Sequence, residues 1–268
     1  MQLNSEEHIE QAFFFEMFLE RLEAGYSTQE ILAASLNEIL SSTKLLAAVD
    51  FLLTDMRHTG LLSPGMDKIR HYFTPLQAYI VAQTEKEGGR FDFRVALEIL
   101  RREAKYKSEN GTIQGIFFYQ FEVLCRNRLG YDFGLEALAA DPIYDEDWKS
   151  WIDMLRRQIG FMDLADLIFV RSENYKKKPG DADVPVLFGD REGRIAWATR
   201  GKDPTLLLAA LSRHLGYPKV PRQRKASEED NAIPMLKRSL VQVEQRLSLL
   251  EEELRGGINI SRYYERGK

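Results

Sequence analysis

Apolar residues recur at helical spacing through the first 175 residues, in stretches that begin at capping residues and end at glycine or Asn-Gly. Ser27 stands three residues before Glu30, and Thr74 stands three before Gln77 with a proline between them. Both spacings are those of a capping box, in which each side chain hydrogen-bonds the backbone N–H of the other residue. Most connections are two to six residues long, as between antiparallel helix neighbours. The pattern predicts a mainly α protein in which residues 1–178 form a multi-helix antiparallel domain.

The stretch 184–198 departs from this helical pattern. β-Branched and aromatic residues lie on both sides of the turn-rich sequence Gly189-Asp-Arg-Glu-Gly193, which is typical of a β-hairpin. The segment from Asp203 to Gly216 then has the start and stop residues of another helix. We therefore expect residues 179–217 to form a small β-hairpin and a helix that pack on the helical domain.

The last part of the chain has an apolar seam whose members are spaced alternately three and four residues apart. This is the a/d spacing of a coiled coil, over about three heptads. We expect residues 232–255 to form a coiled-coil-like helix, with a polar linker at 218–231 before it and a tail at 256–268 after it. Association with another chain is favoured; docking onto its own helical body and an isolated helix remain open. The seam consists of Ile233, Leu236, Leu240, Val243, Leu247, Leu250 and Leu254.

The stretch from Ile113 to Leu129 is apolar on nearly all sides, which is typical of a helix at the centre of a core. It nevertheless contains Gln120, Glu122 and Arg126, and the last two stand one helical turn apart. A charged pair in a buried helix is either a structural ion pair or the floor of a ligand cleft. We expect a structural pair, and these three residues are also the candidate ligand pocket.

Two segments of the helical domain resemble each other. Both begin with an aromatic residue followed by Asp-Phe, at Phe91 and, 40 residues later, at Tyr131. The segment Ala137 to Pro142 is similar to the end of a tetratricopeptide helix pair, but a third copy is absent. Two similarly capped helices explain the pattern better than a repeat architecture, which stays open.

Three features of the sequence bear on where the protein resides, and the first is a cysteine content that fits a reducing compartment. The chain is 44% hydrophobic and 29% charged, and it contains a single cysteine, Cys125, which cannot form an intramolecular disulfide. The first residues lack the basic and apolar regions of a signal peptide. The longest apolar window, 31–53, is interrupted by charged residues, so we expect no membrane span. These features favour a cytoplasmic protein.

The sequence contains none of the common catalytic or cofactor motifs. It lacks a phosphate-binding loop, a dinucleotide fingerprint, a Cys-x-x-Cys pair and a His-Glu-x-x-His motif. The nearest match to a carboxylate-x-x-His metal pair is Asp55 with His58, and no second pair accompanies it. We therefore expect no cofactor and no metal site.

Nucleic-acid binding is an unlikely function on charge grounds. The net charge is −4, and the basic residues between Lys219 and Lys225 are followed directly by three acidic ones. The leading hypothesis is an interaction or scaffold protein that associates with itself or with a partner protein through its C-terminal helix. The alternative is an enzyme or small-ligand binder with a pocket near Glu122 and Arg126. Whether the chain is an enzyme stays open, although the absence of catalytic motifs favours a protein that is not one.

Overall fold

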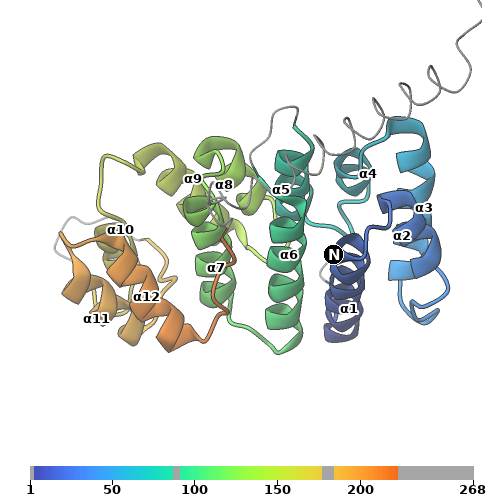
Figure 1. The fold of residues 1–268 in the computed structure, drawn as a ribbon. Helices are drawn as coiled ribbons and strands as arrows, with labels where there is room; N and C mark the ends of the chain where they lie inside the picture. Colours follow the sequence, from blue (N-terminus) through green and yellow to red (C-terminus); the bar gives the residue numbers. More distant parts are fainter. Residues whose placement is uncertain (1–2, 87–90, 177–183, 223–268) are drawn as a thin grey trace, which may run out of the picture. The chain divides into compact units, whose positions relative to one another are not determined.

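The computed structural model describes residues 3–86, 91–176 and 184–222. Of these residues, 67% are helical and none lies in a β-strand, which confirms the prediction of a mainly α protein. They belong to one compact unit that spans Met1–Gln223. The helices labelled in Figure 1 are α1 (Ser5–Glu23), α2 (Thr28–Ser35), α3 (Leu45–Thr59), α4 (Ser63–Lys68), α5 (Pro75–Glu85), α6 (Phe93–Ser108), α7 (Ile113–Arg126), α8 (Tyr131–Ala139), α9 (Glu146–Gln158), α10 (Leu164–Val170), α11 (Asp190–Thr199) and α12 (Pro204–Leu215).

Several helices begin where the capping signals of the sequence predict. The Ser27 side chain accepts from the N–H of Glu30, and the Glu30 carboxylate accepts from the N–H of Ser27 at 2.8 Å. Thr74 and Gln77 form the same box at the start of α5. The boxes satisfy backbone donors that the first turn of a helix leaves without partners. Local sequence therefore sets these helix starts.

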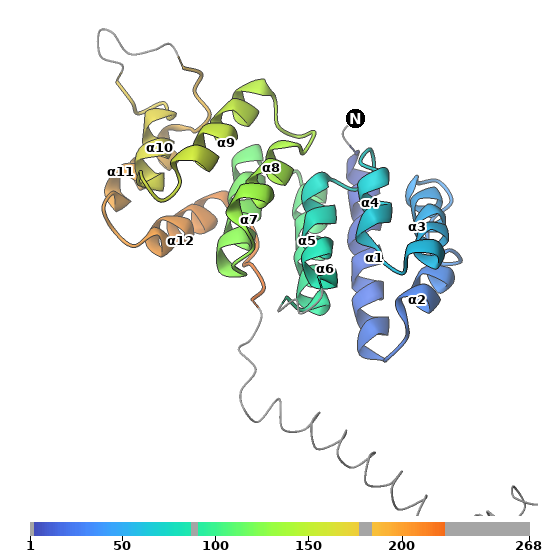
Figure 2. The same ribbon diagram turned by 90° about the horizontal axis from the view of Figure 1, so that it is seen from above.

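Aromatic side chains fill the core between α1 and α6, which lie side by side in Figures 1 and 2. Phe18 of α1 meets Phe93 of α6 edge to face, with ring centroids 5.7 Å apart. Phe15 contacts Phe73, which lies just before α5. These contacts hold α1 against α6 and the start of α5, the elements that surround the site described below.

Helix α7 is the central helix, as its apolar sequence predicts. All ten residues from Gly115 to Leu124 are buried. Phe117 packs edge to face on Trp151 of α9 at a centroid distance of 4.9 Å, and Trp151 in turn packs on Phe188 at 5.0 Å. Helix α9 and the segment that contains Phe188 are thus packed around α7.

The predicted β-hairpin at 184–198 is wrong. Its second half is helix α11, and Asp190 and Glu192 in the first turn favour a helix because they offset its dipole. The first half is extended but pairs elsewhere: the N–H groups of Leu187 and Phe188 donate to the Arg171 carbonyl at 2.9 and 3.1 Å. The two halves therefore never pair with each other.

Gly193 explains why the sequence was misleading at this point. In the sequence it has the setting of a turn residue, but it lies inside α11, where a Cβ atom would come within 2.7 Å of the Ser172 Cβ. Glycine suits this position because α11 packs closely against Ser172 and Asn174, which follow α10. A packing glycine and a turn glycine look the same in a sequence.

The first residues of the predicted linker pack on the body. Val220 is buried, the Lys219 carbonyl accepts from Arg102 Nη1 at 2.6 Å, and the Pro221 carbonyl accepts from Asn127 Nδ2 at 3.2 Å. Residues 218–222 are therefore an extension of the body rather than a linker. The rest of the linker, the heptad seam at 232–255 and the tail lie outside the described residues.

Candidate functional site

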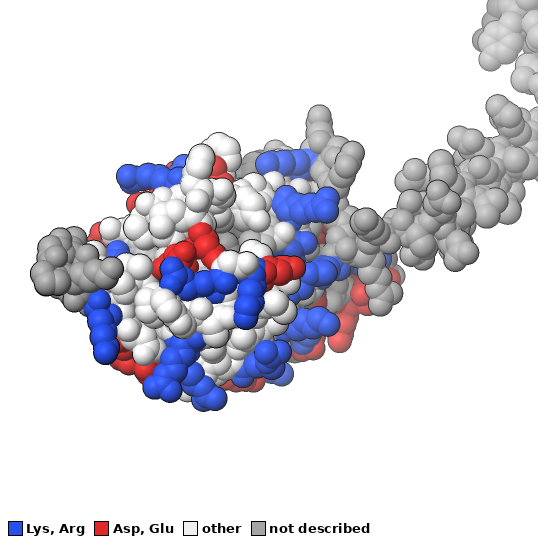
Figure 3. All heavy atoms as spheres, turned by 90° about the vertical axis from the view of Figure 1, so that its left-hand side faces the viewer, with Lys and Arg blue, Asp and Glu red and all other residues white. Residues whose placement is uncertain are grey.

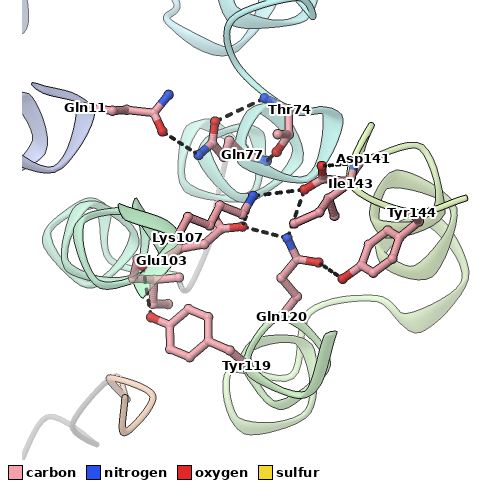
Figure 4. Close-up of polar contacts among 11 residues, drawn as sticks. Gln11, Thr74, Gln77, Glu103, Lys107, Tyr119, Gln120, Asp141, Ile143 and Tyr144 are labelled. Carbon is pink, nitrogen blue, oxygen red and sulfur yellow. Dashed lines mark hydrogen bonds and ion pairs between the residues drawn. The ribbon is translucent and has the colours of Figure 1, made fainter. Parts of the chain in front are cut away.

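A group of buried polar side chains lies between α6, α7 and the connection from α8 to α9 (Figure 4). Gln120 of α7 is at its centre. Its Nε2 donates to Glu103 Oε1 at 2.6 Å and to Asp141 Oδ2 at 3.1 Å, and its Oε1 accepts from the Tyr144 hydroxyl at 2.7 Å. We call Glu103, Lys107, Gln120, Asp141 and Tyr144 the polar cluster; all five are buried.

Lys107 lies one turn beyond Glu103 on α6 and supplies the only positive charge of the polar cluster. Its Nζ is 2.9 Å from Glu103 Oε1 and 3.0 Å from Asp141 Oδ2. Burial by itself would lower the pKa of Lys107, but the charges of Asp141 and Glu103 outweigh it and raise the pKa above its ordinary value. The ammonium stays protonated at neutral pH, and one ammonium faces two carboxylates.

A cavity of about 300 Å³ adjoins the polar cluster at Lys107 and Asp141. His8 and Gln11 of α1 and Gln77 of α5 also line it. Its volume is at the lower end of the ~300–1,000 Å³ that small-molecule sites occupy. The cavity therefore combines the size of a ligand site with several polar groups.

The orientation of the Gln11 amide follows from the capping box of α5. Gln77 Oε1 accepts from the Thr74 N–H at 3.0 Å, so Gln77 turns its Nε2 toward α1. That Nε2 donates to Gln11 Oε1 at 3.2 Å, as Figure 4 shows. The other end of the Gln11 amide is consequently its Nε2 donor. This atom is buried and has no hydrogen-bond partner among the described residues.

His8 lies one turn before Gln11 on α1 and is neutral at pH 7. Burial, and next the charge of Lys107, lower the pKa of His8 to about 4. A neutral imidazole has one donor and one acceptor nitrogen, so His8 can hydrogen-bond in either sense. It contributes no positive charge to the cavity at neutral pH.

The structure divides the three residues of the predicted pocket between two faces of α7. Glu122 pairs with Arg126, as a structural pair would, and its Oε2 accepts from the Tyr217 hydroxyl at 2.9 Å. Gln120 is two residues earlier, about 200° around the helix, and belongs to the polar cluster. None of the three lines the cavity of about 300 Å³.

Cys125 is a poor nucleophile in this fold. Burial raises the pKa of Cys125 to about 11, so the thiol stays protonated at neutral pH. The thiolate is the reactive form of cysteine. The raised pKa therefore leaves little of the reactive thiolate at neutral pH.

The polar cluster itself was missed by sequence reasoning. One feature of the sequence could have predicted it. The spacing of Glu103 and Lys107 places them on the same face of α6 as the buried residues Ala96 and Leu100. A charged pair at i, i+4 on an apolar face requires a buried partner. Asp141 has no comparable signal, because before Pro142 it looks like an ordinary helix stop.

Comparison with models of known protein families, with curated protein sequences and with solved structures finds no match. Within the described ranges, no three His, Cys, Asp or Glu side chains are grouped so that they could hold a metal ion. No helix in those ranges is both long and apolar enough to cross a bilayer.

Proposed function

We propose that this chain is an interaction protein whose helical body carries a C-terminal segment that associates with itself or with a partner helix. The observation that carries the proposal is the seam of seven apolar residues from Ile233 to Leu254, spaced alternately three and four apart. An isolated helix of this length is marginal in water, because only packing of its apolar face offsets the cost of nucleation. The seam therefore needs a covering surface, and a second helix matches its spacing.

The way the chain leaves the body supports this proposal. Tyr217 is held by Glu122, and the Lys219 and Pro221 carbonyls are held by α6 and by Asn127 after α7. The segment beyond Arg222 thus starts from an anchored point on the body. The contacts of Glu122 with Arg126 and Tyr217 support a structural role for this pair over a ligand pocket beside it.

The distribution of charge favours a protein partner over nucleic acid. Residues 184–222 have an excess of basic residues, seven Lys or Arg against three Asp or Glu, so the arrangement of the charges decides the point rather than their number. Figure 3 views the α10–α12 side, where basic side chains are spread out with acidic ones among them rather than forming one basic stripe. A nucleic-acid surface usually gathers its cations on one face to follow the phosphates.

The experiment compares the full chain with a chain ending at Ala226 by sedimentation equilibrium. The full chain should be oligomeric, or bound to a partner, and the shorter one monomeric. Leu240→Asp should reproduce the truncation, because a carboxylate in the seam would be buried without a partner. The matched control is Gln245→Asp, which places the same group on the outer face of the heptad.

Two results would overturn the proposal. If the full and shortened chains are both monomers and truncation lowers the melting temperature, the segment covers its own body. If both are the same oligomer, association resides in the helical body.

A further inference from the structure

The cavity beside the polar cluster has hydrogen-bond donors that its own walls leave unused. Gln11 Nε2 is buried and has no acceptor among the described residues. The Lys107 ammonium has three N–H donors, and within the same ranges its acceptors are the carboxylates of Glu103 and Asp141. Native proteins rarely leave a buried donor without an acceptor, so each such group requires an explanation.

The charges around the cavity select against an ionic ligand. The ammonium of Lys107 is already shared by Glu103 and Asp141, so an anion at the same depth would be repelled by two carboxylates. Lys107 and Asp141 both line the cavity, so a cation would face the Lys107 ammonium just as an anion would face the Asp141 carboxylate. Arg70, which also lines the cavity, is paired with Asp67, with Arg70 Nη2 2.8 Å from Asp67 Oδ1.

Apolar side chains form the rest of the lining. Ile116 and Ile143 contribute to the wall, together with Leu3 and Pro142. A ligand that fits this mixture has one polar end and an apolar or aromatic body. Its polar end must supply an acceptor for Gln11 and can also hydrogen-bond His8 Nδ1, which is buried and has no partner among the described residues.

We propose that this cavity binds a small neutral molecule through an amide or similar carbonyl group, whose oxygen accepts a hydrogen bond from Gln11 Nε2. The apolar body of the ligand lies against Ile116 and Ile143. Neither Glu122 nor Arg126 lines this cavity. It gives the helical body a ligand-binding role besides the interaction role proposed above.

The test uses three probes of nearly the same shape and different charge: benzamide, benzoate and benzylamine. Binding to the full chain at pH 7 is measured by saturation-transfer NMR and by titration of amide chemical shifts. Benzamide should bind and shift resonances of α1 and α6, with both charged probes at least fivefold weaker. Preference for benzoate or benzylamine, or no binding of any probe at millimolar concentration, would overturn the proposal.

Two variants locate the binding. Gln11→Met removes the unused donor and should weaken benzamide about fivefold, the usual effect of one hydrogen bond. Because this change also removes the acceptor of Gln77, Ile143→Trp provides a second variant that fills the cavity and keeps every polar group. It should abolish benzamide binding in a chain that unfolds cooperatively.

The matched control is Gln114→Met on α7. Gln114 Nε2 donates to the Leu187 carbonyl at 2.8 Å, and Gln114 does not line the cavity. This variant loses one amide hydrogen bond at another place and should bind benzamide as the parent does. If Ile143→Trp binds benzamide unchanged, or if Gln114→Met loses as much binding as Gln11→Met, the assignment to this cavity is wrong.

Discussion

The hydroxyl of Tyr217 donates a hydrogen bond to Glu122 Oε2 at 2.9 Å and so joins residues that are 95 positions apart. Glu122 also pairs with Arg126 on its own helix. One carboxylate therefore fastens the end of the described chain to the central helix α7. The pair that the sequence offers as a candidate pocket contacts Tyr217 in the structure.

This anchor leads to a prediction about stability. Arg126→Met should lower the free energy of unfolding by about 3 kcal/mol, because it leaves the buried Glu122 carboxylate without its cation. Glu122→Leu combined with Arg126→Met should recover much of that loss, since no charge then stays buried. Urea denaturation of the three proteins measures both effects. Equal stability of the single mutant and the parent would show that the pair is not structural.

Lys107 should be more sensitive than any exposed lysine of α6. Lys107→Met leaves Glu103 and Asp141 facing each other in the core, which should cost about 3–5 kcal/mol. Lys105→Met on the same helix removes an exposed ammonium and should change stability by less than about 0.5 kcal/mol. Thermal and urea unfolding of both variants tests the difference. A Lys107→Met protein as stable as Lys105→Met would mean that the polar cluster contributes nothing.

Protonation of His8 should make stability depend on pH. Its pKa is lowered to about 4 in the folded chain, from an unfolded value of 6.5. Between these values the unfolded state binds more protons than the folded state. The contribution of neutral His8 to the free energy of unfolding is therefore complete above pH 6.5 and is lost as the pH falls toward 4. Between pH 7 and pH 4.5 the parent should therefore lose about 2 kcal/mol more unfolding free energy than His8→Gln, after allowance for solvent screening. Parallel curves for the two proteins would refute the shift.

Gly193 should tolerate no side chain. Gly193→Ala raises helix propensity, but its Cβ would meet Ser172, so we expect a net destabilisation of about 1–3 kcal/mol. Ser172→Gly in the same chain should restore part of the loss by removing the contacting side chain. Calorimetry of the single and double variants provides the measurement. A stabilised single variant would mean that α11 and Ser172 are not in close contact.

The positions of the helices were largely determined by the sequence alone. Capping boxes such as Ser27 with Glu30 act over three residues, so their hydrogen bonds depend only on the local sequence. The burial of α7 and the pairing of Glu122 with Arg126 also follow from spacing on one helix. The heptad seam at 232–255 is a prediction of the same local kind, and sedimentation will test it.

Only the tertiary structure decided what the local patterns meant. Gly193 looks like a turn residue in the sequence. The reason for a glycine at this position is the close approach of Ser172, which stands 21 positions earlier in the chain. The polar cluster unites Glu103 and Lys107 of α6 with Gln120 of α7 and with Asp141 beyond α8. The spacing of residues along the chain does not predict these contacts. A buried charge is tolerated only where the packing of distant segments brings it a partner.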